Sequence, residues 1–137
     1  TLPDALESIV KNPETTPDFI AMDIKTSPEK YKEKINTAEN LKDKDIEKLL
    51  ERSVKIISTL SDKNYEIRTV LVPHLIEKED IKKIAELLPE NAAWRFAQFR
   101  NENCLDPSYN DIIPYTDSEL SELVTFAKTL IKDSVLR

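Results

Sequence analysis

An aspartate and a lysine stand two residues apart near the end of the apolar segment DFIAMDIK at residues 18–25. The apolar run predicts a β-strand, and because side chains alternate between the two faces of a strand, Asp23 and Lys25 share one face. Ligands of parallel α/β folds bind at the carboxyl ends of the strands. The pair is therefore a candidate ligand site, and the competing interpretation is two solvated charges at a strand edge.

Two further polar residues lie inside strand-like runs. Arg68 is in the middle of YEIRTVLVP at residues 65–73, and Gln98 is near the end of AWRFAQF. A buried guanidinium needs a carboxylate or a ligand as its partner, and Glu66 or Asp23 could satisfy Arg68 without a ligand. For Gln98, a structural role is favoured over a role in ligand binding. If these strand faces point into one barrel interior, a common polar pocket is formed by Asp23, Lys25, Arg68 and Gln98.

The chain contains one histidine and one cysteine. A single imidazole cannot build a histidine-rich metal site, and His74 follows Pro73 in a predicted turn, which favours a loop residue over a base. Cys104 has no second cysteine with which to form a disulfide, so we expect neither a metal nor a redox role for it. We therefore predict that this chain supplies no metal ligands.

The elements that position these residues alternate between helices and strands. Four helices are predicted from apolar residues at helical spacing, over residues 3–11, 43–60, 77–88 and 116–130. Three strands are predicted, over residues 18–25, 65–73 and 93–99. Thr116 and Glu119 form a capping box, Ser27 and Pro28 start a short helix or turn, and a polar loop spans residues 100–115.

Strands that alternate with helices are joined by right-handed crossovers into a parallel sheet. The fold class is therefore α/β, and we predict a parallel-stranded partial (β/α) barrel fragment of about three strands with flanking helices. We treat residues 1–137 as a single domain. Because three strands do not close a barrel, we expect either a small open sheet or further strands upstream, and the start without an initiator methionine suits a fragment.

The composition argues against several classes of function. The net charge of −6 disfavours nucleic acid as a partner, because phosphate binding needs a basic face. No apolar run is long enough to span a bilayer and no signal peptide is recognisable, so we expect no membrane partner and a cytoplasmic location. The chain has no glycine, which excludes nucleotide binding through a glycine-rich loop.

Two motifs in this order, DFIAMDIK and YEIRTVLVP with a helix between them, resemble the later strands of one family. This family is the radical S-adenosylmethionine (SAM) proteins of the glycyl-radical-enzyme activating type. The closest resemblance is to activating proteins of anaerobic ribonucleoside-triphosphate reductase, in which QFR is followed by a segment like NCLDPSYNDIIPYTDSEL. The resemblance covers most of the chain, and the order and spacing of the motifs carry it.

The resemblance implies an incomplete (β/α)6 barrel in which a [4Fe–4S] cluster, bound by the motif C-x-x-x-C-x-x-C, reductively cleaves SAM. The resulting 5′-deoxyadenosyl radical takes hydrogen from a glycine of a partner glycyl radical enzyme. By the same resemblance Asp23 and Lys25 line the SAM pocket, and Arg68 contacts polar groups of the cofactor. Val72 lies near the adenine, and Gln98 faces the ligand.

The chain departs from the family pattern in its cysteines, its glycines and one turn. It lacks the three-cysteine motif and the Gly-Gly-Glu segment that holds the methionyl amine, and it has Pro73-His74 where relatives have Pro-Gly. We therefore expect the C-terminal half of an activating protein that, in isolation, holds no cofactor, has no catalytic residue and is inert. A half barrel leaves the edge of its first strand unpaired, so we also expect a homodimer through that edge.

Two alternative functions remain open. Barrels of the orotidine-monophosphate-decarboxylase type use the strand-end motif Asp-x-Lys-x-x-Asp, but Pro28 replaces the last aspartate here and the phosphate-binding glycines are missing. The other alternative is a non-catalytic α/β interaction or ligand-binding domain whose charged strand ends serve only solubility.

Overall fold

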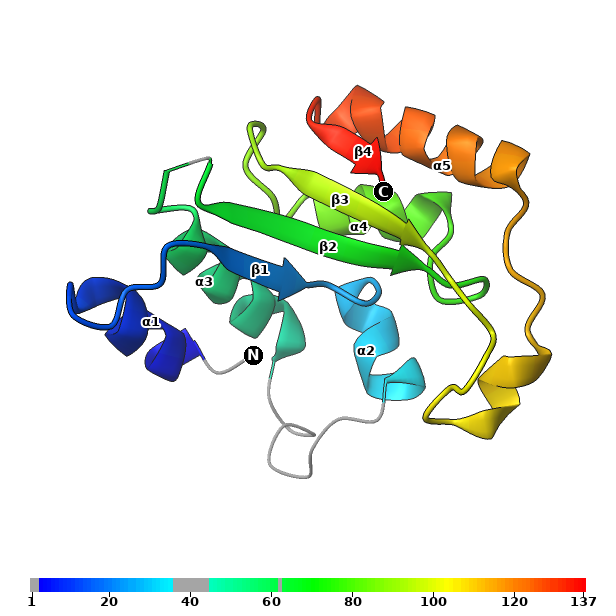
Figure 1. The fold of residues 1–137 in the computed structure, drawn as a ribbon, viewed down its shortest axis with the longest axis horizontal. Coiled ribbons are helices and arrows are strands. Elements are labelled where there is room, and N and C mark those ends of the chain that lie inside the picture. Colours follow the sequence, from blue (N-terminus) through cyan, green and yellow to red (C-terminus); the bar gives the residue numbers. More distant parts are fainter. Residues whose placement is uncertain (1–2, 36–44, 62) are drawn as a thin grey trace.

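The protein is described by a computed structural model that covers residues 3–35, 45–61 and 63–137 (Figure 1). The α/β fold class predicted from the sequence is confirmed, because helices and parallel strands alternate along the chain. The elements are, in chain order, α1 (Pro3–Lys11), β1 (Ile20–Asp23), α2 (Pro28–Lys34), α3 (Ile46–Ile57), β2 (Tyr65–Leu71), α4 (Lys78–Ala85), β3 (Trp94–Gln98), the 3-10 helix η2 (Pro107–Asp111), α5 (Asp117–Leu130) and β4 (Ser134–Leu136).

The sheet has four strands in the order β1-β2-β3-β4, and every neighbouring pair is parallel. Strands that follow each other in the chain are therefore neighbours in space, which is the arrangement found in (β/α) barrels. The sequence analysis predicted about three strands and missed β4, whose three residues follow α5 directly and pair with β3 from Ser134 onward. A three-residue strand is too short to show the alternation that identifies strands in a sequence.

Helix termini follow the sequence signals closely. The predicted capping box of α5 is present, because the Thr116 hydroxyl accepts the Glu119 N–H and the Glu119 carboxylate accepts the Thr116 N–H at 2.8 Å. Helix α3 begins after its N-cap Asp45, and the predicted start at residues 43–44 lies outside the described residues. These caps satisfy backbone N–H groups that a helix end otherwise leaves unpaired.

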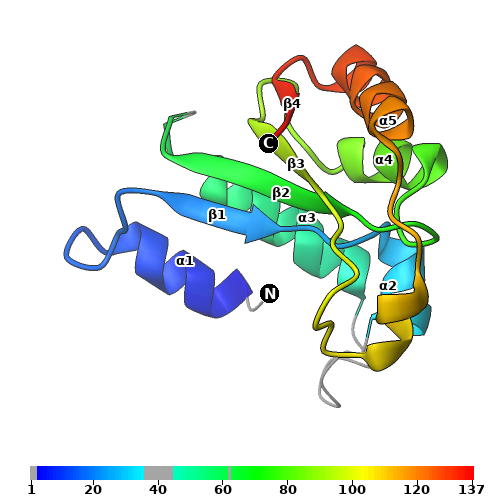
Figure 2. The same cartoon turned by 45° about the vertical axis from the view of Figure 1, so that its right-hand side comes forward.

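One face of the sheet packs against the helices. Figures 1 and 2 show α3 and α4 behind the strands, and the alternate strand residues that point toward the helices are buried. Helix α5 packs on α4 and β4, while α1 packs on α3. The core residues contributed by the strands are Met22, Ile24, Tyr65, Ile67, Leu71, Trp94 and Phe96.

The opposite face of the sheet, here called the open face, carries no helix in the described part of the chain (Figure 1). Its side chains follow from the strand period and the register. They are Ala21, Asp23, Glu66, Arg68, Val70, Arg95, Ala97 and Val135. Asp23 and Arg68 are exposed and polar, so the open face rather than the core offers a surface for ligands.

Among the described helices, none combines the length and the hydropathy needed to cross a bilayer.

Candidate functional site

Asp23 and Arg68 meet on the open face, where the carboxyl end of β1 lies beside the middle of β2. The two residues are register partners in the parallel ladder, and Arg68 Nε donates to Asp23 Oδ1 at 2.8 Å. Both side chains are half exposed, at 50% for Arg68 and 47% for Asp23. The sequence analysis named Asp23 as one of two structural partners for Arg68, and the structure selects it. The pair is solvated, so it can separate to contact a ligand at small cost.

Lys25 lies two residues beyond Asp23, where β1 runs into the loop before α2, and it is exposed. Its main-chain N–H donates to the Tyr31 hydroxyl at 2.9 Å. Within the described part of the chain its ammonium has no carboxylate at ion-pair distance. Among the described residues, Lys25 is therefore a cation without a carboxylate partner, two positions beyond Asp23 in the chain.

Tyr31 belongs to the same edge, although the sequence analysis did not identify it. Burial raises the pKa of the Tyr31 phenol, the Lys25 N–H lowers it in part, and the negative charge of Asp23 raises it further. The phenol is therefore neutral at physiological pH. Tyr31 lies on the first turn of α2, directly after the helix start at Ser27-Pro28. This position in the sequence could have identified it as a residue of this edge.

Val72 follows the last residue of β2 and is half-buried against the core. Its carbonyl accepts the N–H groups of Leu75 and Ile76, at 3.1 and 2.9 Å, and so closes the turn that leads to α4. Val70, which is 42% exposed, precedes it on the open face. Val70 and Val72 therefore supply apolar surface next to the polar residues of β1 and β2.

Gln98 does not join this group, and the prediction that four side chains surround one pocket is wrong on this point. Gln98 pairs in register with Leu71, which is fully buried against the helices, so both residues point away from Arg68. The Gln98 amide donates to the Tyr115 carbonyl at 3.3 Å. The aromatic residues Trp94 and Phe96 face the helical layer, and the two-residue period takes Gln98 to the same side. The open-face residues of β3 are instead Arg95 and Ala97.

Two further ion pairs cover the amino-terminal part of the open face, and the sequence analysis missed both. Arg95 contacts the Asp133 carboxylate through two nitrogens, at 2.9 and 2.7 Å. This contact raises the pKa of Arg95 and lowers that of Asp133, in each case through the hydrogen bond to the other partner. Arg137 contacts the buried Glu66 in the same bidentate way, at 2.9 and 2.7 Å. These arginines are thus already neutralised by carboxylates.

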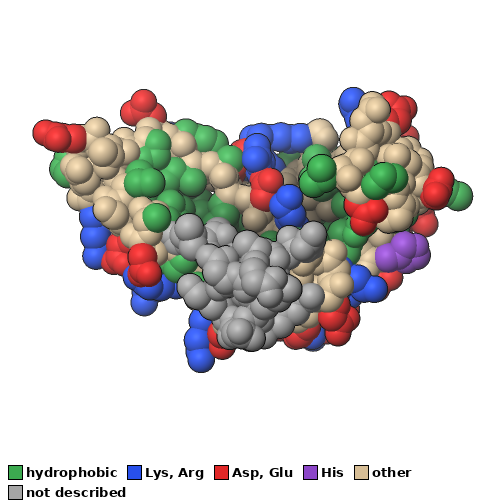
Figure 3. Space-filling view, turned by 90° about the horizontal axis from the view of Figure 1, so that it is seen from below, with side chains coloured by type: hydrophobic (Ala, Val, Ile, Leu, Met, Phe, Trp, Pro, Cys, Tyr) green, Lys and Arg blue, Asp and Glu red, His purple; other side chains and the backbone are tan. Residues whose placement is uncertain are grey.

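Figure 3 shows charged side chains of both signs gathered at a hollow in the middle of the upper side in that view, with hydrophobic side chains to the left and right. The described open face therefore combines matched ion pairs, one unmatched ammonium and an apolar margin.

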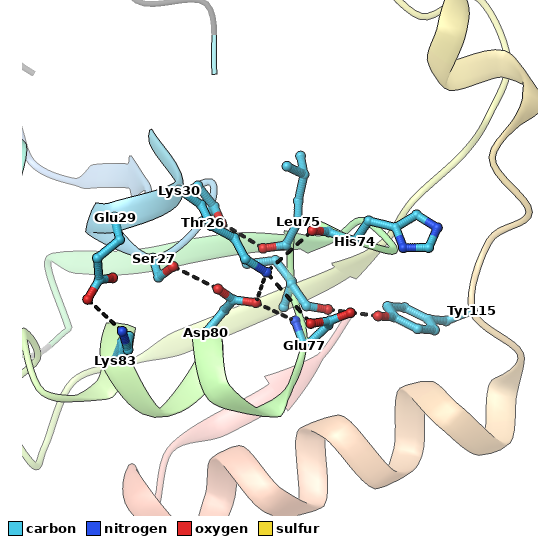
Figure 4. A network of polar contacts seen from close by, with 11 residues as sticks. Thr26, Ser27, Glu29, Lys30, His74, Leu75, Glu77, Asp80, Lys83 and Tyr115 are labelled. Carbon is cyan, nitrogen blue, oxygen red and sulfur yellow. Dashed lines mark hydrogen bonds and ion pairs between the residues drawn. The ribbon is translucent and has the colours of Figure 1, made fainter. Parts of the chain in front are cut away.

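A buried carboxylate fixes the loop that presents this edge (Figure 4). Asp80, on α4, accepts the Ser27 hydroxyl at 2.7 Å, the Lys30 ammonium at 2.7 Å and the Glu77 N–H at 2.9 Å. Ser27 is the N-cap residue of α2, ahead of Pro28, but its hydroxyl bonds to Asp80 and not to a backbone N–H of the helix. The Thr26 hydroxyl adds a bond to the Leu75 carbonyl at 2.6 Å. The loop after β1 is therefore tied to the turn after β2.

His74 stands in that turn, at the position where the resemblance has glycine. Its backbone φ of 69° lies in the left-handed region, so the turn adopts the conformation that glycine favours. Figure 4 shows the imidazole at the right of the network, apart from the dashed contacts. The histidine thus occupies a strained backbone position without a visible role for its ring.

Within the described ranges, no group of three or more His, Cys, Asp and Glu side chains is arranged to hold a metal ion. Cys104 is half-buried and its thiol lies 3.7 Å from the Arg100 carbonyl.

The chain is similar over its whole length to a protein of Methanocaldococcus jannaschii that is provisionally named a glycyl-radical enzyme activating enzyme. The identity is 30% over 139 aligned residues, and the chain spans 55% of the length of that protein. No protein-family model matches the chain. No solved structure matches it significantly.

Proposed function

We propose that this chain is the C-terminal part of a radical SAM enzyme that activates a glycyl radical enzyme. The observation that carries the proposal is the polar edge formed by Asp23, Arg68 and Lys25, where the carboxyl end of β1 lies beside the middle of β2. Its support is the whole-length similarity to a protein named as such an activating enzyme. We also propose that the partner enzyme is an anaerobic ribonucleoside-triphosphate reductase, and the support for this is the resemblance of the sequence motifs. We further propose that the protein is cytoplasmic.

The residues of this edge fit SAM chemically. SAM carries a carboxylate, to which the Lys25 ammonium can bind. It also carries ribose hydroxyls, which can donate hydrogen bonds to the Asp23 carboxylate. Arg68 orients Asp23 through the 2.8 Å bond. The side chains of Val70 and Val72 supply apolar surface for the adenine ring. These residues would bind and orient the cofactor, whereas Gln98, whose amide donates to the Tyr115 carbonyl, is left out of the proposed site.

The iron–sulfur cluster does not fit this chain. A site-differentiated [4Fe–4S] cluster needs three thiolates, and the sequence contains one cysteine. We therefore propose that the cluster ligands lie in the part of the longer protein that this chain does not include, and that the chain by itself is inactive. When both groups are bound in the whole protein, SAM supplies the hydrogen-abstracting chemistry that creates a glycyl radical on the partner.

Equilibrium dialysis of radiolabelled SAM against the full-length protein tests the cofactor site. Because a hydrogen bond to a charged group contributes about 1.5–3 kcal/mol, Lys25→Met should raise the Kd for SAM about tenfold or more. Asp23→Asn should also weaken binding. The matched control is Lys82→Met, which removes an exposed lysine from α4 away from the open face and should leave the Kd unchanged.

Unchanged SAM affinity in both site variants would refute the assignment of this edge. A full-length protein that binds no SAM at all would instead favour the alternative, a non-catalytic α/β interaction or ligand-binding domain.

A further inference from the structure

The connection between β3 and α5, here called the β3–α5 loop (residues 100–113), is a folded unit. The Asn101 amide donates to the Asn110 carbonyl at 3.2 Å, and the Cys104 N–H donates to the Asn110 side-chain oxygen at 3.0 Å. These bonds join the two halves of the loop across six to nine residues of chain. The loop therefore has its own hydrogen-bonded framework.

The middle of the β3–α5 loop is also fixed. The Asp106 carboxylate accepts both the N–H and the hydroxyl of Ser108, at 3.0 and 2.7 Å, and so caps η2. The Tyr109 ring meets Phe99 edge-on with centroids 6.4 Å apart, and it packs against the core. The loop is thus anchored to the domain by an aromatic contact.

Two large apolar side chains project from this ordered loop into solvent. Leu105 is 103% exposed and Ile113 is 84% exposed, the highest values among the exposed large hydrophobic residues described. Burying such side chains on association is favourable, and a loop that is already ordered loses little further conformational freedom when it binds. The two residues therefore have the properties of preformed anchors for a protein interface.

The charge around these anchors indicates the partner's surface. The β3–α5 loop carries the carboxylates Glu102, Asp106 and Asp111 against the single cation Arg100, a net charge of −2 from three negative and one positive group. Acidic and hydrophobic side chains also lie together along the right-hand rim in Figure 3. An acidic loop is repelled by nucleic acid and by anionic lipid surfaces, and it is attracted to a basic protein surface.

The position of the loop links it to the proposed site. Figure 2 shows η2 in front of α2, beyond the carboxyl ends of β1, β2 and β3, which is the same edge that carries Asp23 and Lys25. If this edge holds the cofactor, the reacting glycine of the partner has to enter there. The partner's surface then has to contact the rim of the sheet at this end.

We propose that Leu105 and Ile113 on the β3–α5 loop are the docking anchors for the glycyl radical enzyme, whose matching surface is an apolar pocket edged by lysine or arginine. The proposal rests on the proposed function for the identity of the partner. It assigns partner recognition to a loop that supplies none of the proposed cofactor-binding residues.

The test measures binding of the full-length protein to the purified glycyl radical enzyme of the same organism by biolayer interferometry. The double variant Leu105→Ser/Ile113→Ser should raise the Kd for the partner about tenfold or more, as expected for two anchor residues. The Kd for SAM, measured separately, should equal that of the wild type, which also shows that the variant is folded. The matched control Leu130→Ser changes a partly exposed leucine in the last turn of α5 and should bind the partner normally.

A second variant tests the charge. Glu102→Lys/Asp111→Lys should lower the association rate and weaken its dependence on salt, because electrostatic steering acts mainly on association. Unchanged partner affinity in the double serine variant would refute the docking proposal. The docking proposal would also be refuted if sedimentation showed that the serine substitutions abolish self-association of this chain, because the loop would then bind a second copy and not the glycyl radical enzyme. A wild-type protein that binds the partner but no SAM would refute the proposed cofactor site while leaving the docking loop in place.

Discussion

Asp80 is the residue whose removal should damage the candidate site most, although it lies outside it. Its side chain is 3% exposed and accepts hydrogen bonds from Ser27, Lys30 and the Glu77 N–H. Asp80→Ala would leave the buried Ser27 hydroxyl without its acceptor. The Lys30 ammonium would lose its 2.7 Å ion pair and keep only the Glu77 carboxylate at 3.7 Å and the His74 carbonyl at 3.4 Å. Breaking a buried ion pair costs about 3–5 kcal/mol, and because the Lys30 side chain is 28% exposed it can regain some water, so we expect about 3 kcal/mol.

Urea unfolding followed by circular dichroism measures this loss. With an m-value of about 2 kcal/mol per molar urea, a loss of about 3 kcal/mol lowers the midpoint by about 1.5 M. The matched control is Glu79→Ala, which removes the neighbouring, exposed carboxylate from the same first turn of α4 and should cost at most about 1 kcal/mol.

A double variant separates the charge effect from general loss of packing. In the Asp80→Ala background, Lys30→Met removes a half-buried ammonium whose remaining carboxylate partner, Glu77, lies 3.7 Å away, so it should restore part of the lost stability rather than add to the loss. The reasoning is refuted if Asp80→Ala costs no more than Glu79→Ala, or if the Lys30→Met substitution lowers stability further in that background.

Three other predictions follow from backbone and charge. His74→Gly should raise the free energy of unfolding by about 0.5–1 kcal/mol in urea titrations, because it relieves a left-handed backbone at φ 69°, whereas Asn103→Gly at φ 55° should gain less because asparagine tolerates this region. The bond to Arg95 lowers the pKa of Asp133 in the folded state, so the pair stabilises the protein above the unfolded pKa of Asp133, and this contribution is lost as the pH falls through the folded pKa. Asp133→Asn should therefore flatten the decline of the free energy of unfolding below about pH 4. An unchanged pH dependence of the free energy of unfolding in this acidic range would contradict the prediction. The isolated chain should form dimers in sedimentation equilibrium through the outer edge of β1. The N–H groups of Ile20 and Ile24 donate to β2 and the segment before it, so the N–H group of Ala21 points outward. Ala21→Pro should therefore give a monomer without breaking the sheet.

The sequence was sufficient for features that depend on local spacing. Alternation within DFIAMDIK predicted that Asp23 and Lys25 share one face, and the demand of a guanidinium for a carboxylate limited the structural partner of Arg68 to Glu66 or Asp23. The order of helices and strands also predicted the parallel sheet, and the Thr116–Glu119 spacing predicted the cap of α5. Each of these follows from the geometry of a single strand, a single helix or their order along the chain.

Only the tertiary structure decided how separate segments face each other. The period of β3 groups Gln98 with Trp94 and Phe96, but the packing of the helices determines that this group lies on the helical side of the sheet, with Gln98 exposed at its end, and not on the side of Arg68. The contacts of Asp80 with the loop after β1 join residues about fifty positions apart, and no periodicity in the sequence encodes such a distance. The sequence by itself therefore determined which residues could form the polar edge, and the packing of helices on one face of the sheet determined which of them meet there.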